Sequence, residues 1–320
     1  MYNSIVKNHH RSNLQSILFL TIIIIGFNSI KLFAQPVANE KPKTHFKLAL
    51  NAYSFNEVLV AKETERKRAF TLLDLLDWCA VQNIEAIDLT GYYFPGYPEV
   101  PSDEYIYNLK RKAFKLGIDI SGTGIRNNFA DPDPKVRAAD VERTKKWIVI
   151  ASKLGAPVIR LFAGAIPKGY ENKWDEVAGW MIECFKECAA YGEQHGVIVG
   201  IQNHGDMLQT AEQCIKVMNG VNSEWAGIIV DTGNFRVANP YGDIETIVPY
   251  AVNWQVKESV IGNSSFVKAD YEEIMRILKK TGYRGYLPIE TIKKDKTYDP
   301  FTGVPNMLKD LHAAQDKVFN

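Results

Sequence analysis

Short apolar runs that end in polar residues recur along the chain. The clearest is Val197–His204 (VIVGIQNH), which follows a glycine and ends in Gln-Asn-His. A continuous apolar run of this length is typical of a strand that is buried on both faces, as in a parallel sheet. Similar polar endings close three further runs: Ile228–Asp231, Val252–Lys257 and Tyr286–Glu290. We expect these four endings to form one site, because ligands of parallel α/β proteins bind at the carboxyl ends of the strands.

Eight strand candidates alternate with segments of helical periodicity. They are Phe46–Ala52, Ile84–Leu89, Ile118–Gly122, Pro157–Phe162, Val197–Gln202, Gly227–Asp231, Ala251–Val256 and Gly285–Glu290. Alternation of strands and helices implies parallel strands joined by right-handed crossovers, and eight such strands close a barrel. We therefore predict an α/β fold, a single (β/α)8 TIM barrel over residues 46–320. A doubly wound open sheet is the alternative, but no GxGxxG motif follows the first strand candidate, so we also expect no nucleotide cofactor.

Capping residues support the helices between these strands. Thr210 with Gln213, and Asp270 with Glu273, have the spacing of a capping box or a close variant of it. Glycines stand between a helix and the next strand, where a left-handed cap is needed. These glycines are Gly117, Gly155, Gly196 and Gly282.

The first residues resemble a secretory signal. Basic residues precede an apolar run from Ile17 to Ile30, which is too short for a comfortable membrane span and is followed by Phe33-Ala34-Gln35. We predict a signal peptide over residues 1–34 and a flexible segment over 35–45, with an uncleaved anchor as the alternative. The mature protein is then expected to be periplasmic or secreted, without stable membrane association.

Composition restricts the partners. The chain has 320 residues, with 38 basic and 37 acidic side chains, so no basic excess favours nucleic acid as a partner. The four cysteines all fall in predicted helices, where we expect buried free thiols, since two cysteines one helical turn apart meet disulfide geometry poorly. These cysteines are Cys79, Cys184, Cys188 and Cys214.

The strand ends carry amide and carboxylate side chains. They include Asn51 and Tyr53, Asp88, Arg126, Arg160, Gln202 with His204, Asp231 with Asn234, Gln255 with Lys257, and Glu290. Oxygen atoms that converge from neighbouring strands make a site for one hard divalent cation, such as Mg²⁺, Mn²⁺ or Ca²⁺. The alternative is that Asp231 and Glu290 cap loops or pair with Lys257 and Arg160.

The order of the endings resembles the xylose-isomerase-like barrels, the superfamily of sugar phosphate isomerases/epimerases and endonuclease IV. The endings are IQNH at 201–204, DTGN at 231–234, QVKE at 255–258 and PIET at 288–291. In that family the corresponding strands end in Glu-Asn-His, Asp-Gly-His, His-x-Lys-Asp and Glu. By position, the family's metal ligands correspond to Gln202, Asp231, Gln255 and Glu290. Asp231 and Glu290 match the family pattern, whereas the two glutamines depart from it.

These departures change the expected chemistry. In the family's ketose epimerases, two glutamates exchange protons on opposite faces of a carbon, and a glutamine at 202 cannot take up a proton. Glu290 remains as a base, while His204 and Lys257 could act as acid or base or stabilise an enolate. The site should bind a cation weakly, and metal-free operation is an alternative. The proposed contacts to substrate are Asn51, Tyr53, Arg126, Arg160 and Asn234, with an inward structural role as the favoured alternative for Arg160.

The resemblance implies a secreted isomerase/epimerase-like enzyme that abstracts a proton next to the carbonyl of a sugar or keto-sugar. Two alternatives stay open: a 3-keto-glycoside lyase or hydratase, and a non-catalytic carbohydrate-binding barrel. The DNA-repair branch is disfavoured, because His204 alone among the histidines lies at a predicted strand end. An aromatic loop at 91–98 (GYYFPGYP) could be a platform for a sugar ring or could pack on itself.

Overall fold

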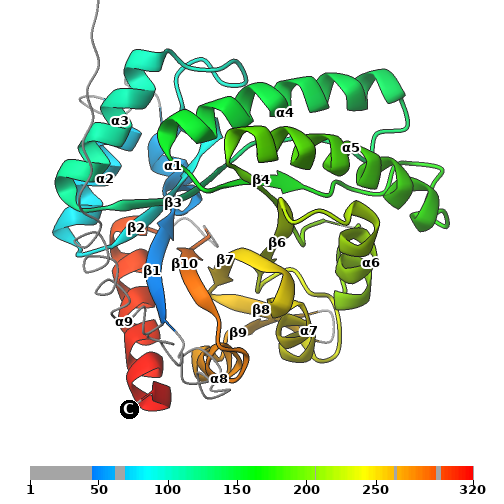
Figure 1. Ribbon diagram of the computed structural model, residues 1–320. Helices are drawn as coiled ribbons and strands as arrows, with labels where there is room; N and C mark the ends of the chain where they lie inside the picture. Colours follow the sequence, from blue (N-terminus) through cyan, green and yellow to red (C-terminus); the bar gives the residue numbers. More distant parts are fainter. Residues whose placement is uncertain (1–44, 62–68, 206, 263–264, 293–296, 320) are drawn as a thin grey trace, which may run out of the picture. The chain divides into compact units, whose positions relative to one another are not determined.

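The computed structural model describes residues 45–61, 69–205, 207–262, 265–292 and 297–319. Within them, eight parallel strands form a closed barrel in the order β1-β10-β7-β6-β5-β4-β3-β2 (Figure 1). The strands are β1 His45–Asn51, β2 Ala86–Thr90, β3 Asp119–Gly124, β4 Val158–Phe162, β5 Ile198–Gln202, β6 Ala226–Asp231, β7 Ala251–Lys257 and β10 Arg284–Glu290. The predicted TIM barrel is confirmed, and each predicted strand lies within two residues of an observed one. The predicted signal peptide, 1–34, and residues 35–44 of the predicted flexible segment lie outside the described residues, and His45 belongs to β1.

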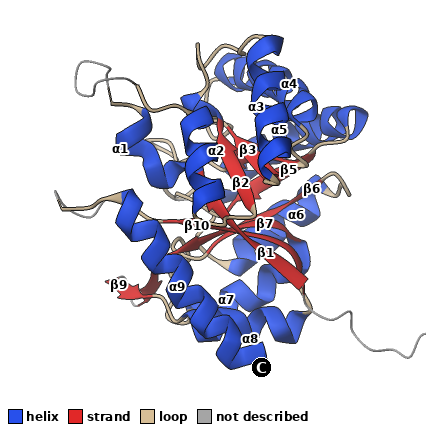
Figure 2. Ribbon diagram, turned by 90° about the vertical axis from the view of Figure 1, so that its left-hand side faces the viewer, coloured by secondary structure: helices blue, strands red, loops and turns tan. Residues whose placement is uncertain are grey.

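Helices surround the barrel and connect its strands (Figures 1 and 2). They are α1 Asn56–Leu59, α2 Leu72–Val81, α3 Asp103–Leu116, α4 Pro134–Leu154, α5 Trp174–His195, α6 Ala211–Val221, α7 Pro240–Ile247, α8 Tyr271–Thr281 and α9 Pro300–Phe319. Thr210 and Gln213 form the predicted capping box, and Asp270 accepts a hydrogen bond from the backbone of Glu273. The four predicted glycine caps all adopt the left-handed conformation.

The core lies between the strands and the surrounding helices. All residues of β2 and β6 are buried, as expected for strands covered on both faces. Helix α5 contributes Phe185, whose ring packs edge-on against Phe129 with 5.2 Å between centroids. The four cysteines are buried and free, as predicted, and burial raises the pKa of each thiol. These thiols therefore belong to the packing of the helices.

A small hairpin after β7 was not predicted. Strands β8, Ser259–Gly262, and β9, Ser265–Lys268, pair antiparallel and lie apart from the barrel sheet. Both strands are only four residues long, and every residue of β9 is exposed, so the sequence has no run of buried apolar positions that would predict a strand here. The hairpin places Phe266, which is 75% exposed, beside the strand ends.

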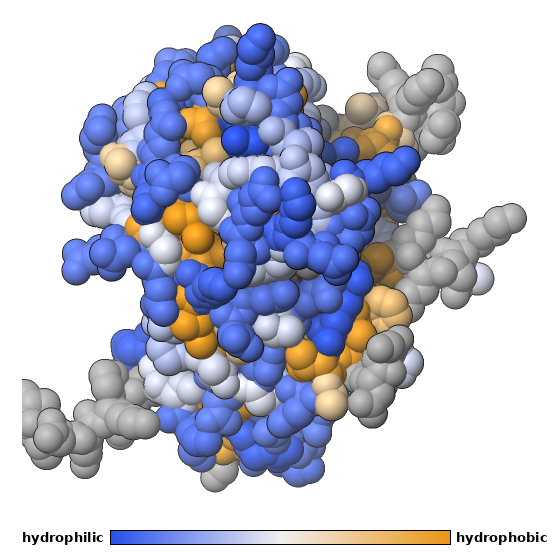
Figure 3. All heavy atoms as spheres, turned by 90° about the vertical axis from the view of Figure 1, so that its right-hand side faces the viewer, coloured by the Kyte–Doolittle hydropathy of each residue, from blue (hydrophilic) through white to orange (hydrophobic). Residues whose placement is uncertain are grey.

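The surface is mostly hydrophilic. On the face shown in Figure 3, apolar side chains form separate patches between hydrophilic ones, which is ordinary for a globular domain. None of the helices in the described ranges is both long and apolar enough to span a membrane.

Candidate active site at the carboxyl ends of the strands

A cavity of about 400 Å³ opens at the carboxyl ends of the barrel strands. Ten of the eleven residues predicted as acid or base, substrate contact or metal ligand line it: Asn51, Tyr53, Arg126, Arg160, Gln202, His204, Asn234, Gln255, Lys257 and Glu290. The remaining residue, Asp231, has no exposed surface and lies against this wall, bonded to Gln202. The four polar strand endings therefore meet in one place, as the sequence predicts, and their chemical roles stay predictions.

Register brings the carboxylates next to their partners. In the parallel pairing of β6 with β7, Asp231 lies opposite Gln255, and in the pairing of β10 with β7, Glu290 lies opposite Lys257. Side chains of paired residues on neighbouring strands point to the same face. Strand β7 therefore carries the central side chains of the site, with one carboxylate strand on each side of it.

Asp231 is held by a dense set of hydrogen bonds. The Gln202 amide donates to Asp231 Oδ2 over 2.6 Å, and the backbone NH of Gly233 donates to Oδ1 over 3.0 Å. The backbone of Asp231 exchanges two hydrogen bonds with the side chain of Asn203, at 2.7 and 2.9 Å. These bonds fix the carboxylate in one orientation.

Gln202 also donates to Gln255 Oε1 from the same amide nitrogen. Its own carbonyl oxygen is buried and has no partner among the described protein groups. A buried acceptor without a donor costs free energy, roughly 1–3 kcal/mol. A substrate hydroxyl could supply the missing donor, because Gln202 lines the cavity.

Lys257 contacts both carboxylates of the site. Its ammonium group donates a hydrogen bond to Glu290 Oε1 and lies 3.4 Å from Asp231 Oδ2. All three side chains are nearly completely buried. The alternative considered for the carboxylates, pairing with Lys257, is therefore observed, while Arg160 pairs with neither at hydrogen-bonding distance.

Burial and neighbouring charges act in opposite directions on the pKa values of Glu290 and Lys257. Burial raises the pKa of Glu290 above its usual value, and the neighbouring Lys257 opposes part of that rise. Burial by itself lowers the pKa of Lys257, but Asp231 and Glu290 together outweigh it and raise the pKa above 10.5. Lys257 therefore stays a cation, and Glu290 can exchange a proton closer to neutral pH than an exposed glutamate.

His204 stands at the edge of the cavity. Its ring packs against Phe162 with 4.9 Å between centroids. Desolvation lowers the pKa of His204, with Lys257 and Arg160 adding to the effect and Asp231 opposing it. The imidazole is therefore neutral at pH 7, and as a neutral ring it has one donor and one acceptor nitrogen.

Two arginines and a tyrosine form the opposite wall. Buried Arg160 donates to Tyr92 Oη over 2.7 Å and to the carbonyl of Ile125 over 3.1 Å. Arg126 lies over the ring of Tyr92, with its guanidinium carbon 4.5 Å from the ring centroid. Because a Cβ at Gly124 would lie 2.8 Å from Arg160 Nε, that glycine makes room for the buried arginine. Arg160 is thus both packed inward and open to the cavity.

The aromatic loop divides between two roles. Tyr92 lines the cavity, as does Tyr53. Phe94 instead is buried, with its ring edge-on against Trp147, and Tyr97 also contacts Trp147. The packing alternative therefore holds for Phe94 and Tyr97, and a sugar platform stays open for Tyr53 and Tyr92.

Several lining residues were missed from the sequence. Phe162 follows Arg160 by two positions on β4, so strand alternation could have assigned it to the same face. Ser259, Phe266 and Ile292 come from the hairpin and from the segment after β10, which carried no pattern of their own. Gly233 also lines the cavity, where a Cβ would lie 2.8 Å from Lys257 Cγ.

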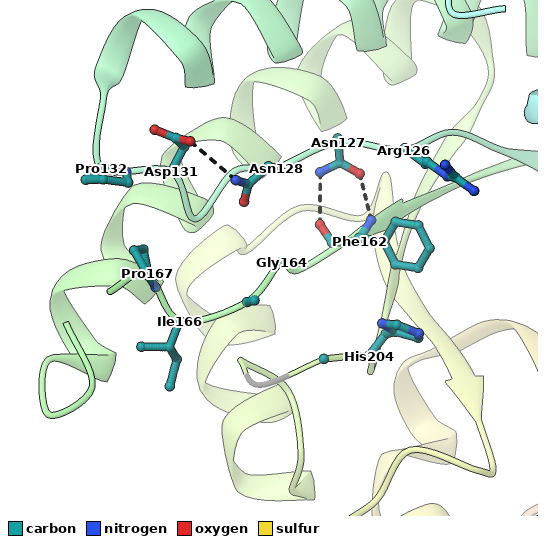
Figure 4. Close-up of a pocket in the computed structure, with 12 residues that line it drawn as sticks. Arg126, Asn127, Asn128, Asp131, Pro132, Phe162, Gly164, Ile166, Pro167 and His204 are labelled. Carbon is teal, nitrogen blue, oxygen red and sulfur yellow. Dashed lines mark hydrogen bonds between the residues drawn. The ribbon is translucent and has the colours of Figure 1, made fainter. Parts of the chain in front are cut away.

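A second cavity of about 620 Å³ adjoins the first (Figure 4). Arg126, Phe162 and His204 line both. Asn127 exchanges two hydrogen bonds with the backbone of Phe162, at 2.7 and 2.9 Å, and so fixes the position of Phe162, which lines both cavities. The lining of the second cavity includes the apolar residues Pro132 and Ile166.

The central residues, as arranged, do not fit a divalent cation. Such an ion needs several oxygen lone pairs directed at one point. Both oxygens of Asp231 already accept hydrogen bonds, and Gln202 turns its NH2 group toward the other oxygens. The ligand set Gln202, Asp231, Gln255 and Glu290 stays a prediction that these contacts do not favour.

Comparison with known proteins places the chain in a family. The family model described as xylose isomerase-like TIM barrel matches residues 76–311. No curated protein matches the chain in sequence.

Solved structures share the fold at low sequence identity. A D-psicose 3-epimerase from Clostridium cellulolyticum H10, solved with D-tagatose, is 17% identical over 85% of this chain and 98% of its own, with a TM-score of 0.65. The 3-keto-D-glucoside 4-epimerase of E. coli is 11% identical over 84% and 99%, with a TM-score of 0.65. The IOLI protein, solved with a zinc atom, is 14% identical over 86% and 100%, with a TM-score of 0.67.

Proposed function

Since the chain belongs to the xylose isomerase-like TIM barrel family, we propose that it is an isomerase- or epimerase-like enzyme acting on a small carbohydrate. The reaction begins with removal of a proton from the carbon next to a carbonyl group of a sugar or keto-sugar. The observation that carries the proposal is the buried Glu290 carboxylate, paired with the Lys257 ammonium, on the wall of a cavity lined by hydrogen-bonding groups.

Glu290 acts as the base in this proposal. Its carboxylate takes the proton from the carbon, and the electron pair of the broken C–H bond moves to the carbonyl oxygen to give an enolate. The Lys257 ammonium stabilises the negative charge that develops on the enolate oxygen. Such electrostatic stabilisation by a preorganised group is usually the largest single contribution to enzymatic rate enhancement. Return of the proton to the neighbouring carbon gives an isomer. An epimer forms when a proton reaches the opposite face of the same carbon, and because Gln202 cannot carry a proton, the proposal assigns that delivery to solvent water in the cavity.

The substrate class follows from the lining. Amide groups, tyrosine hydroxyls and arginines alternate around the cavity, which suits the many hydroxyl groups of a sugar. Asn51, Tyr53 and Asn234 are the proposed hydroxyl partners, and Arg126 and Arg160 are the proposed partners of more acidic oxygens. Two proteins with the same fold, the D-psicose 3-epimerase and the 3-keto-D-glucoside 4-epimerase, are named for reactions at a carbon next to a carbonyl.

Hydrogen exchange with solvent tests the proposal directly. The protein is incubated in D2O with D-psicose, D-tagatose, D-fructose and 3-keto-glucose in turn, and deuterium in each sugar is followed by NMR. Proton abstraction predicts deuterium at the carbon next to the carbonyl of at least one sugar, whether or not a product accumulates. No exchange in any of them, with binding retained, would favour the carbohydrate-binding barrel instead.

A lyase acting on 3-keto-glycosides is the second candidate, and the second cavity favours it. In such a substrate, the enolate formed by Glu290 can expel the oxygen substituent on the adjacent carbon. The bond to the leaving oxygen breaks as the new C=C bond forms, and the leaving oxygen needs a proton. His204 lies at the boundary of the two cavities, where its neutral imidazole can donate a hydrogen bond to the leaving oxygen. The leaving oxygen takes its proton from protonated Glu290 or from solvent, and the second cavity can hold the leaving group.

Product analysis separates the two candidates. A 3-keto-glycoside with a chromophoric leaving group releases that group under the lyase mechanism. Epimerisation leaves the glycosidic bond intact and changes only the configuration of the ring. Release without epimerisation would establish the second candidate, and the reverse would establish the first.

The cellular location is part of the proposal. We place the enzyme in the periplasm or outside the cell, on the evidence of the basic and apolar segments that precede Gln35. Sugar phosphates are held inside cells, so this location favours unphosphorylated substrates. N-terminal sequencing of the exported protein tests it, and an N-terminus at Gln35 is expected.

A further inference from the structure

The position of Lys257 suggests how the site keeps its charge balance. Its ammonium group contacts Glu290 and lies 3.4 Å from Asp231, so one positive charge lies between two buried carboxylates. That is the place where two carboxylates would otherwise hold a divalent cation. Gly233 makes the placement possible, because any side chain there would meet Lys257 Cγ.

The neighbouring amide points the same way. Gln202 directs its NH2 group at Asp231 Oδ2 and Gln255 Oε1. These two oxygens accept hydrogen bonds from the Gln202 amide nitrogen. As a metal ligand, Gln202 would instead have to direct its amide oxygen at the ion. If the Gln202 amide were turned over, its oxygen would face the carboxylate oxygen of Asp231, which has no donor to offer. The Asp231 carboxylate therefore selects the donor orientation of Gln202.

We infer that, with glutamines at positions 202 and 255, the Lys257 ammonium group is the resident cation of this site and that the protein works without a metal. The family pattern His-x-Lys-Asp also has a lysine at this position, so the departure from a metal site lies in the two glutamines. The inference concerns cation binding, so it goes beyond the proposed function and does not depend on it. With Lys257 present, the two carboxylates and the ammonium carry a net charge of one negative unit. A divalent ion would have to enter beside a fixed positive charge and displace it from Asp231 and Glu290.

Titration of the protein with Mn²⁺ by calorimetry tests the inference. The wild-type protein, purified and dialysed against chelator, is expected to show no binding at about 1 mM Mn²⁺. The Lys257→Met variant leaves two buried carboxylates without their cation. It is expected to bind one Mn²⁺ at least about tenfold more tightly than the wild type, because a repelling charge within a few ångströms has been removed.

A combined variant sharpens the test. Lys257→Met together with Gln202→Glu and Gln255→His supplies four donors of the types that bind divalent ions. We expect it to bind Mn²⁺ and Zn²⁺ more tightly than the single variant. Lys186→Met, on the exposed side of α5, is the matched control and should bind no metal.

Metal content decides the question even if a variant fails to fold. Elemental analysis of the wild-type protein should find no stoichiometric transition metal, and its melting temperature should not rise when Mn²⁺ or Zn²⁺ is added. Tight binding of one metal ion per wild-type chain would overturn the inference. So would Mn²⁺ affinity that is the same in the wild type and in a folded Lys257→Met variant.

Discussion

Lys257 and Glu290 lie opposite one another in the parallel register of β7 and β10, and the lysine ammonium donates a hydrogen bond to the glutamate. The pairing joins the proposed base to the cation that stabilises the enolate. It also explains why Glu290 can remain ionised although it is buried, since an unpaired buried carboxylate would be neutral.

Replacement of Glu290 by glutamine removes the base and keeps the shape of the side chain. We expect kcat for proton exchange to fall by about 10²–10⁴-fold, because this is the usual contribution of a positioned general base. Substrate binding should be retained. The control is Glu187→Gln on the surface of α5, where an exposed ion pair is lost and activity should not change. Undiminished exchange in Glu290→Gln would remove this residue from the mechanism.

Replacement of Gln202 by alanine removes the donor to Asp231 and Gln255. If Gln202 only contacted a ligand, its loss would weaken ligand binding with little change in stability. The structure instead places the amide in a buried network, so we expect a loss of stability of about 1–3 kcal/mol in addition. Chemical denaturation measures it. An unchanged midpoint with unchanged ligand affinity would show that the network contributes to neither.

Substitution of Gly233 by alanine should displace Lys257. The added Cβ would lie 2.8 Å from Lys257 Cγ and 3.1 Å from the carbonyl oxygen of Ser259. We expect activity to fall at least about tenfold, with a loss of stability of about 1–3 kcal/mol from overpacking. Gly179→Ala is the comparison, because a Cβ in that helical position meets nothing within 4 Å. Equal kinetics in the two variants would argue against a role for the position of Lys257.

The pH dependence of kcat/KM follows from Glu290. The residue must be ionised to accept a proton, and burial raises its pKa above the usual 4.5. Activity should therefore rise with pH through a midpoint above 4.5 and then remain level, because Lys257, with its pKa raised above 10.5, stays protonated until strongly alkaline pH. The pKa of His204 is lowered from 6.5, so a His204→Asn variant serves as the check. If the rising limb vanishes in that variant, it belongs to His204 and not to Glu290.

The second cavity can be blocked without touching the first. Ala165 lines only the second cavity, so Ala165→Phe should reduce its free volume. If that cavity holds a leaving group, KM for a 3-keto-glycoside with a bulky leaving group should rise by roughly tenfold, while the methyl glycoside is unaffected. Ala190→Phe, on the exposed side of α5, controls for the added aromatic ring. Equal KM changes for both glycosides would place the leaving group elsewhere.

The barrel was predictable because its strands are buried on both faces. Continuous apolar runs such as Val197–Gln202, with a glycine before them and polar residues after them, can be recognised as buried strands without knowledge of distant contacts. The location of the site was predictable for a related reason, because the carboxyl ends of all the parallel strands lie at one rim of the barrel. Exposed short strands such as Ser265–Lys268 lack that signal, and the hairpin was missed.

The pairing inside the site could not be predicted in the same way. The predicted barrel makes the strands that end in Lys257 and Glu290 neighbours, but the sequence does not show in which register they pair or that the two side chains meet. The orientation of the Gln202 amide likewise depends on which oxygens surround it. The choice between a metal ligand and a hydrogen-bond donor therefore became visible only in three dimensions.

The most direct test of the account is deuterium exchange into a keto-sugar substrate, measured on wild-type protein before and after exhaustive treatment with chelator. If Lys257 is the cation of the site, exchange at the carbon next to the carbonyl is expected at the same rate in both samples, with no gain on adding Mn²⁺. Exchange that is lost on chelation and restored by a metal ion would contradict the assignment of Lys257 as the cation of the site.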